Sequence, residues 1–308
     1  MRLFVFIQFE LLTPAMKKAY LILAHKNLNQ LRRLLLKLDD GKSYFFIHID
    51  LKTEISASFQ ELINKTQNIT LVKRISTRWG GFSLADATLN GLKAIKASGL
   101  DFQYISLLSG QDYPIKSNKD IDAYLSDSEH SIFLDYFPLP DYRRWDTGGT
   151  YRYKKYFFGT SSISLFFSKS LNLLATFIPP LGRKMPFLLR PYCGSQWWTI
   201  DQYAMNYIIN YIDQNPKYYR FHKYTFAPDE LFFHIILLNA KDERIQKGIT
   251  NNNLRYMKWI SYDRPHPEIL TENDLHDLKS SSSLFARKFD PDQDEAILNS
   301  IDEKILAV

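Results

Sequence analysis

The order of apolar runs and helix-like segments in the first half of the chain limits its fold more than any other feature. Four short apolar runs predict strands, at residues 19–25, 43–50, 69–72 and 104–108. Segments with apolar residues at helical spacing lie between them, at residues 27–38, 56–65 and 83–97. Strands that alternate with helices predict an α/β fold with a mostly parallel central sheet flanked by helices. Ligands bind such sheets at the carboxyl ends of the strands.

The second half of the chain is less regular. We expect strands at residues 132–136 and 195–200, and helices at 202–212, 229–238, 272–278 and 292–306. Residues 162–178 are apolar almost all round, but their length and Lys169 argue against a membrane-spanning helix. We expect a buried helix there, and the alternative is a helix that contacts a membrane at its surface.

The start of the chain is a further apolar run, residues 1–15, which is broken by Glu10. We expect it to be an extension outside the folded domain, and a weak signal anchor is the alternative. Residues 16–308 then form a single domain, with a nucleotide-binding half at about 16–135 and an acceptor and catalytic half at about 136–308. No internal repeat is visible.

Composition excludes several classes of protein. The single cysteine, Cys193, rules out a disulfide framework and a cysteine-based zinc site, and it favours a reducing compartment. The net charge of +6 favours anionic ligands, but the basic residues are scattered, so we do not expect nucleic-acid binding. The chain has no glycine-rich dinucleotide fingerprint, no phosphate-binding GxxxxGK[ST] loop and no HExxH zinc motif.

One acidic pair needs a separate interpretation. Asp120 and Asp122 form a DxD pattern, which many sugar-nucleotide enzymes use to hold a divalent ion. The pair falls at a predicted helix start, where helix capping by Asp120 explains it. We therefore expect no metal site in this chain.

Six polar segments occur where the chain should turn or where a strand or helix ends. They read HID, RWGGFS, LLSGQDYPIKS, GSQWWTI, FAPDELFFH and LFARKFD, and they begin at residues 48, 78, 107, 194, 226 and 284. In this order the set resembles the core-2/I-branching β-1,6-N-acetylglucosaminyltransferase family, which also contains the peptide O-xylosyltransferases (glycosyltransferase family 14). The resemblance covers about residues 17–301. It implies a GT-A-like fold and an inverting, metal-independent transfer from a UDP-sugar, with N-acetylglucosamine or xylose as donor.

The resemblance also implies roles for individual residues. An inverting transfer needs a carboxylate to deprotonate the acceptor hydroxyl, and Glu230 matches the family's catalytic glutamate. Its neighbour Asp229 is interpreted as a helix cap or dipole partner. The departing diphosphate needs positive charge, for which Lys288 matches the family lysine and Arg287 lies beside it. A further diphosphate arginine of the family corresponds to Arg264, with His266 as the next basic residue.

The donor and acceptor contacts are expected elsewhere. For the donor we expect contacts from His25 and Asp50, which end two strands. The turn at Arg78, Trp79 and Gly80 is expected to contact the nucleotide, and Asp112 is expected to face the sugar hydroxyls. For the acceptor we expect Gln196, Trp197 and Trp198, together with the aromatic and basic loop 142–156.

The alternatives at this point are another UDP-hexose as donor in surface-polysaccharide synthesis, or a non-catalytic nucleotide-sugar-binding protein. The expected partners are a UDP-sugar and a glycan or lipid-linked glycan acceptor. The expected location is the cytoplasm, with peripheral contact at the inner membrane face as an alternative.

Overall fold

A computed structural model describes residues 16–260 and 266–307. Residues 1–15, the expected extension, and Arg264 lie outside the described residues. In the described part of the chain, a sheet of seven strands has the order β3-β2-β1-β4-β7-β6-β8. The first four in this order are parallel: β1 (Lys18–Ala24), β2 (Ser43–Ile49), β3 (Ile69–Leu71) and β4 (Tyr104–Ser109). This confirms the expected α/β fold.

The sheet changes direction at its other edge. Strand β7 (Tyr192–Asp201) runs antiparallel to β4 and to β6 (Ile132–Pro138), and β6 pairs in parallel with β8 (Ile249–Asn251). A second, three-stranded sheet joins β5 (Asp112–Pro114), β10 (Phe285–Arg287) and β9 (Arg255–Met257). In this small sheet Arg287 lies opposite Asp112. Two motifs that are far apart in the sequence therefore meet at one strand pair.

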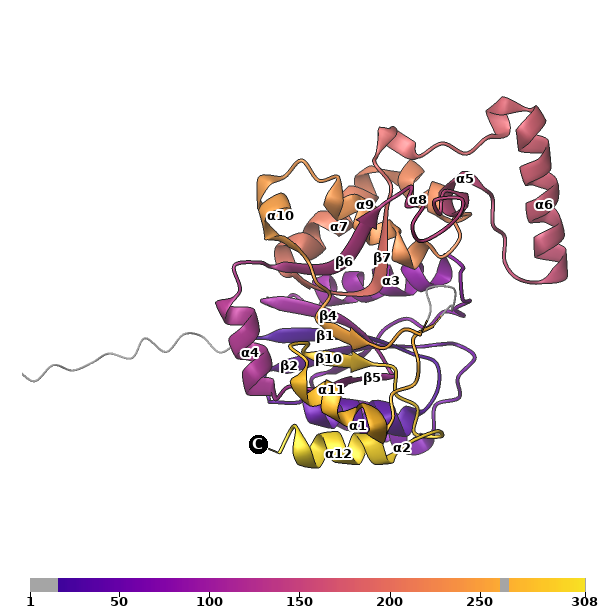
Figure 1. The fold of residues 1–308 in the computed structure, drawn as a ribbon. Helices are drawn as coiled ribbons and strands as arrows, with labels where there is room; N and C mark the ends of the chain where they lie inside the picture. The colour runs from indigo at the N-terminus through magenta and orange to yellow at the C-terminus, as the bar shows by residue number, and fades with distance from the viewer. Residues whose placement is uncertain (1–15, 261–265, 308) are drawn as a thin grey trace, which may run out of the picture.

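Helices cover both faces of the large sheet (Figure 1). Leu21 of β1 faces a core built with α3 (Ser83–Ala97), α7 (Gln202–Gln214) and α9 (Phe232–Leu238). The next residue, Ile22, faces the opposite core, built with α1 (Leu28–Leu38), α2 (Ala57–Lys65) and α12 (Ala296–Lys304). This alternation is what a strand buried on both faces requires, because successive side chains point to opposite sides.

Helix α3 lies unusually close to the sheet at Gly91. A Cβ atom on this glycine would lie 2.2 Å from the Cδ1 atom of Leu21. Real Cβ atoms essentially never approach another carbon so closely, so a side chain here would force Leu21 or the helix to shift. The absence of a side chain at position 91 therefore allows α3 to pack this closely against Leu21 of β1.

The remaining elements surround the two sheets. They are α4 (Asn118–Asp127), α5 (Tyr151–Lys154), α6 (Ser162–Phe177), α8 (Pro216–His222), α10 (Glu243–Gly248), α11 (Leu275–Ser280), and single 3-10 turns at Pro179–Leu181, Pro186–Leu188, Pro228–Glu230 and Glu272–Asp274. The predicted helix 229–238 is thus a 3-10 turn followed by α9. The predicted helix 292–306 begins only at Ala296.

The interpretation of Asp120 as the helix cap is wrong. Ser117 caps α4, because its Oγ atom accepts a hydrogen bond from the backbone N–H of Asp120, which lies in the first turn. Asp122 instead forms an ion pair with Lys18, whose Nζ atom also lies 3.0 Å from Asp40. The two aspartates of the DxD pattern therefore have different structural partners.

The expectation of a buried helix at residues 162–178 is also wrong. Helix α6 lies at the edge of the molecule, away from both sheets (Figure 1). Only Ser168 of this helix is buried, whereas Ile163 and Phe177 are 71% and 76% exposed. Among the described residues, no helix combines the length and apolar character needed to cross a bilayer.

Candidate active site

The Trp-Gly-Gly turn contacts the segment that carries Glu230. The carbonyl of Gly80 accepts a hydrogen bond from the N–H of Ala227 at 2.8 Å. Gly80 has a φ of 71°, and a Cβ atom there would lie 2.9 Å from the ring of Phe226. Trp79 packs edge-on against the same ring, with the centroids 5.7 Å apart. A residue without a side chain is thus needed for these two motifs to meet.

Glu230 ends the 3-10 turn that precedes α9, and its side chain is 36% exposed. Its Oε2 atom accepts a hydrogen bond from Nη1 of Arg152, a residue of α5, at 2.5 Å. The guanidinium of Arg152 is nearly buried and lies 4.9 Å from the ring centroid of Trp145. Burial opposes the charge of Arg152, but Cys193 and Glu230 outweigh it and raise the pKa of this arginine. A permanently charged group therefore holds the Glu230 carboxylate in place.

Arg152 is the main site residue that sequence reasoning missed. It was included only in the aromatic and basic loop 142–156, as one of several basic residues. Glu230 lies 78 positions away, and no local spacing relates the two residues. The only available signal was an arginine among aromatic residues, which is common in protein cores and surfaces alike.

Asp229 does not cap a helix, because the N-cap residues of the 3-10 turn and of α9 are Ala227 and Leu231, and neither start has a side-chain cap. Its side chain is buried, and its Oδ1 atom has no hydrogen-bond partner in the described part of the chain. Burial, together with the nearby negative charge of Glu230, raises the pKa of Asp229 to about 7. Asp229 is thus partly protonated near neutral pH.

Arg287 is held rigidly on the second sheet. Its Nη1 atom lies 2.7 Å from Oδ1 of Asp112, and its guanidinium carbon lies 4.2 Å from the ring centroid of Trp197. Asp112 is fully buried, and its other oxygen accepts a hydrogen bond from the N–H of Ser109. We expected Asp112 to face the sugar hydroxyls, but in this structure both of its oxygens have protein partners. The ion pair with Arg287 holds that guanidinium in place.

Other cations gather near Arg287. Burial lowers the pKa of Lys288, and the positive charges of Arg287 and Lys26 lower it further. The pKa of His25, which follows β1, is also lowered by burial and by the charges of these three cations. Asp290 pairs with Lys26 at 2.5 Å and Asp112 pairs with Arg287, so two carboxylates offset part of this charge. The three cations outnumber these two carboxylates, and the remaining positive charge favours an anionic ligand.

His266 is influenced by the charges of both the cations and Glu230. Its ring centroid lies 6.0 Å from that of Trp79. Burial lowers the pKa of His266. The positive charges of Lys288 and Arg287 lower this pKa further, and the negative charge of Glu230 acts in the opposite direction. His266 is thus within electrostatic range of both the carboxylate and the cations. The charges of Glu230, Arg287 and Lys288 therefore all act on one imidazole.

Two of the expected donor contacts have different surroundings. Asp50 is buried, and its oxygens accept hydrogen bonds from the N–H groups of Lys52 and Thr77. Burial opposes its charge, but hydrogen bonds from Thr77 and Lys52 outweigh this and lower the pKa of Asp50. In this structure Asp50 ties two loops together. Arg78 is exposed and lines, with Trp79, a cavity of about 140 Å³.

The expected acceptor residues point in different directions. Trp197 and Trp198 are adjacent on β7, so their side chains lie on opposite faces of the strand. Trp197 lies under Arg287, whereas Trp198 is 1% exposed and packs against Phe233 in the core. Trp198 therefore has no surface on which a sugar could stack. Gln196 is half-buried, and its Nε2 atom has no hydrogen-bond partner among the described residues.

Across residues 16–260 and 266–307, no group of three or more His, Cys, Asp or Glu side chains is arranged to hold a metal ion.

Known proteins are similar to this chain over nearly its whole length. "Xylosyltransferase 2" of Rattus norvegicus is 25% identical over 94% of the chain. "Beta-glucuronosyltransferase GlcAT14B" of Arabidopsis thaliana is 23% identical over 94% of the chain. The chain spans about a third of the length of the first relative (34%) and 66% of the second. The family model described as "Core-2/I-Branching enzyme" matches residues 18–279. The expected family is thereby confirmed: this chain belongs to the core-2/I-branching enzyme family.

Proposed function

We propose that this chain is an inverting glycosyltransferase that moves a sugar from a UDP-sugar to a hydroxyl group of a glycan acceptor. The observation that carries the proposal is that the charges of a partly exposed carboxylate, Glu230, and of the cations Arg287 and Lys288 act on the same histidine, His266. Family membership supports the same reaction class.

Glu230 is the proposed general base. Inversion in one displacement requires a carboxylate that removes the proton of the acceptor hydroxyl as this oxygen attacks the anomeric carbon. Arg152 binds Oε2 of Glu230, and no donor from the described residues lies on Oε1. Oε1 can therefore accept the acceptor hydroxyl while Arg152 keeps the carboxylate in position. Asp229, with a pKa of about 7, is buried and less suited to this role.

Arg287 and Lys288 are proposed to bind the diphosphate as it departs. The negative charge on the leaving group grows in the transition state, and fixed cations stabilise it most when they need no rearrangement. Asp112 and Trp197 hold Arg287 in this way. We propose that these cations take the place of a divalent metal ion. The turn at Arg78, Trp79 and Gly80 is proposed to contact the nucleotide.

The donor sugar is proposed to be N-acetylglucosamine or xylose, and the acceptor a glycan or a lipid-linked glycan. The relatives support testing xylose first, because one is named for xylosyl transfer. The plant relative is named for glucuronosyl transfer, so UDP-glucuronic acid belongs in the same panel.

The test is the release of UDP from a panel of UDP-sugars with mixed glycan acceptors, in EDTA and in manganese. We expect release from one donor in EDTA. Release that requires manganese would contradict the metal-independent mechanism. Binding of UDP without release from any donor would favour a nucleotide-sugar-binding protein.

Glu230→Gln should retain UDP binding and lose transfer by about a hundredfold or more, as expected when a general base is removed. Glu243→Gln is the matched control, because Glu243 is an exposed carboxylate on α10. Turnover of Glu230→Gln at the wild-type rate would remove Glu230 from the mechanism.

A further inference from the structure

Helix α6 has its polar side toward the protein. Asn172 exchanges two hydrogen bonds with the backbone of Tyr156, at 2.7 and 2.9 Å. The buried Oγ atom of Ser168 accepts a hydrogen bond from the N–H of Phe158. Ser164, Ser168 and Asn172 are spaced by four residues and therefore form one polar ridge along the helix. A surface helix of a globular protein normally has the reverse orientation, with its apolar side inward.

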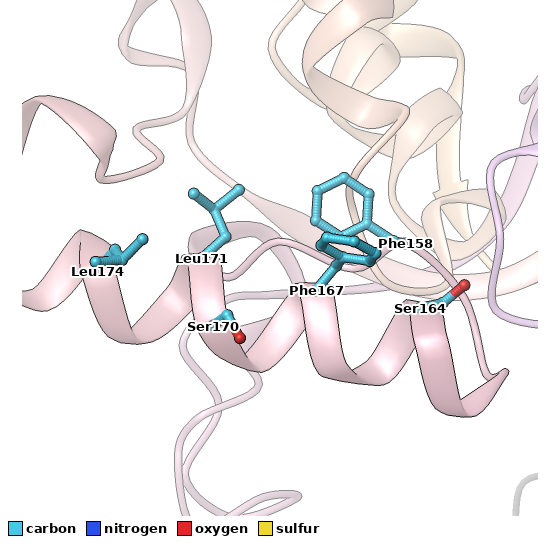
Figure 2. A pocket seen from close by; sticks show the side chains of 6 residues that line it. All are labelled: Phe158, Ser164, Phe167, Ser170, Leu171 and Leu174. Carbon is cyan, nitrogen blue, oxygen red and sulfur yellow. The ribbon is translucent and has the colours of Figure 1, made fainter.

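The outward side of α6 is apolar. Ile163, Phe166, Leu173 and Phe177 are each between 61% and 76% exposed. The loop that follows adds Leu188, which is 98% exposed. A cavity of about 370 Å³ lies along the helix; Figure 2 shows the side chains that line it: Phe158, Ser164, Phe167, Ser170, Leu171 and Leu174. A continuous exposed apolar surface of this kind marks a site of interaction with a protein or a membrane.

The surrounding segment carries charge of only one sign. Residues 147–200 contain seven Lys or Arg and no Asp or Glu. Five of the seven cations are exposed in the structure: Lys154, Lys155, Lys169, Lys184 and Arg190. Exposed cations beside an apolar surface are complementary to anionic lipid head groups above acyl chains.

The same charges argue against a second copy of this chain as the occupant. In a two-fold symmetric dimer a patch meets its own copy, so these cations would face their equivalents. Repulsion between them opposes association, and no acidic residue of the segment relieves it. A bilayer that contains anionic lipid supplies the opposite charge.

The segment that follows α6 is firmly attached to the body of the protein. The guanidinium of Arg183 is buried and donates hydrogen bonds to the carbonyls of Lys155, Phe221 and Tyr224. Its guanidinium carbon lies 4.2 Å from the ring centroid of Phe221. The chain that leaves α6 is thus fastened to the body of the protein, and α6 is presented outward.

We propose that α6 and the loop at residues 178–190 form a docking surface for a bilayer that contains anionic phospholipid. The apolar side chains enter the boundary between head groups and acyl chains, and the exposed lysines and Arg190 contact the head groups. Phe158, which lines the cavity along α6, also lines the cavity beside Trp79. Docking therefore places the candidate active site close to the membrane surface.

The test is co-sedimentation of the full chain with vesicles of phosphatidylcholine, with and without phosphatidylglycerol. We expect binding to the anionic vesicles that weakens as salt is raised. The triple variant Ile163→Gln, Phe166→Gln and Phe177→Gln should weaken the partition coefficient by about tenfold or more for each side chain replaced. Leu36→Gln is the matched control, because Leu36 is 62% exposed on α1.

A charge variant tests the second half of the proposal. Lys169→Glu with Lys184→Glu should weaken binding by about fivefold or more for each charge. Lys119→Glu with Lys279→Glu, on α4 and α11, is the control and should leave binding nearly unchanged. Thermal melting of every variant checks that the fold is retained.

Three outcomes would overturn the proposal. The first is that the wild-type chain does not bind anionic vesicles. The second is that the triple variant binds as well as the wild type, which would assign binding to another part of the chain. The third is that the wild type is a dimer that the triple variant converts to a monomer, without vesicle binding by either form. None of these readouts depends on glycosyl transfer.

Discussion

The pair formed by Asp112 and Arg287 offers a stringent test of how the candidate site is built. Replacing Asp112 by Asn keeps the shape of the side chain but removes its charge. One oxygen of Asp112 lies 2.7 Å from Arg287, and the other accepts a hydrogen bond from the N–H of Ser109. An amide that still accepts from Arg287 presents its NH₂ group to the N–H of Ser109, so two donors face each other.

The expected loss of stability is large because both partners are inaccessible. Asp112 is 0% exposed and Arg287 is 13% exposed. Removing one member of a buried ion pair costs about 3–5 kcal/mol, because the other charge stays buried without compensation. Arg255 is a second buried cation near Asp112: burial lowers its pKa to about 10, and Asp112 acts in the opposite direction. Loss of Asp112 therefore affects two arginines, which favours the upper part of that range.

Urea unfolding followed by circular dichroism measures this loss for Asp112→Asn, for Arg287→Met and for the double variant. The double variant should be more stable than the sum of the single losses predicts, by about 1.5–3 kcal/mol, because it leaves neither charge without its partner. A loss below about 1 kcal/mol for Asp112→Asn, or additive losses, would refute the claim that Asp112 positions Arg287.

Three further predictions concern other parts of the molecule. Lys288→Ala should weaken UDP binding by about tenfold, measured by calorimetry, and unchanged affinity would remove Lys288 from the diphosphate site. Asp229 has a folded-state pKa of about 7, above its unfolded value of about 4, so it contributes stability that is lost as pH rises between these two values. The stability of Asp229→Asn should therefore rise relative to the wild type as pH increases through this window, measured by urea unfolding, and a constant difference would contradict the assigned pKa. Gly91→Ala should destabilise the fold by about 1–3 kcal/mol because its Cβ atom would overlap Leu21 of β1, whereas Asn90→Ala on the same helix should have little effect on the unfolding midpoint.

The fold and the site differ in how far sequence patterns can predict them. Strands β1, β2, β3 and β4 agree with their predicted ranges to within one residue at each end. Strands β1, β2 and β4 are local runs whose burial leaves a largely continuous apolar pattern, whereas β3 lies at the edge of the sheet and its Thr70 is exposed. Strands β5, β8, β9 and β10 have three residues each and were not predicted. Unlike the predicted run at residues 69–72, these three-residue strands are not part of a longer apolar run, so periodicity does not distinguish them from loops.

Helix α6 shows how an apolar composition can mislead. Its sequence is apolar almost all round, and composition alone favours burial. The structure places Ser168 and Asn172 against the segment at residues 156–158, and these hydrogen bonds turn the apolar side outward. Which side of the helix faces the solvent thus depends on a few polar contacts with another segment.

Local patterns and motifs were sufficient to predict the alternation of strands and helices, the family, and Glu230 and Lys288 as candidate site residues. These properties depend on local periodicity and on short motifs. The pairing of Arg152 with Glu230, the pairing of Asp112 with Arg287 and the burial of Trp198 became visible only in the folded chain. The physical reason is that each depends on contacts between separate elements. Asp112 and Arg287 lie 175 positions apart and meet only through the register of β5 and β10.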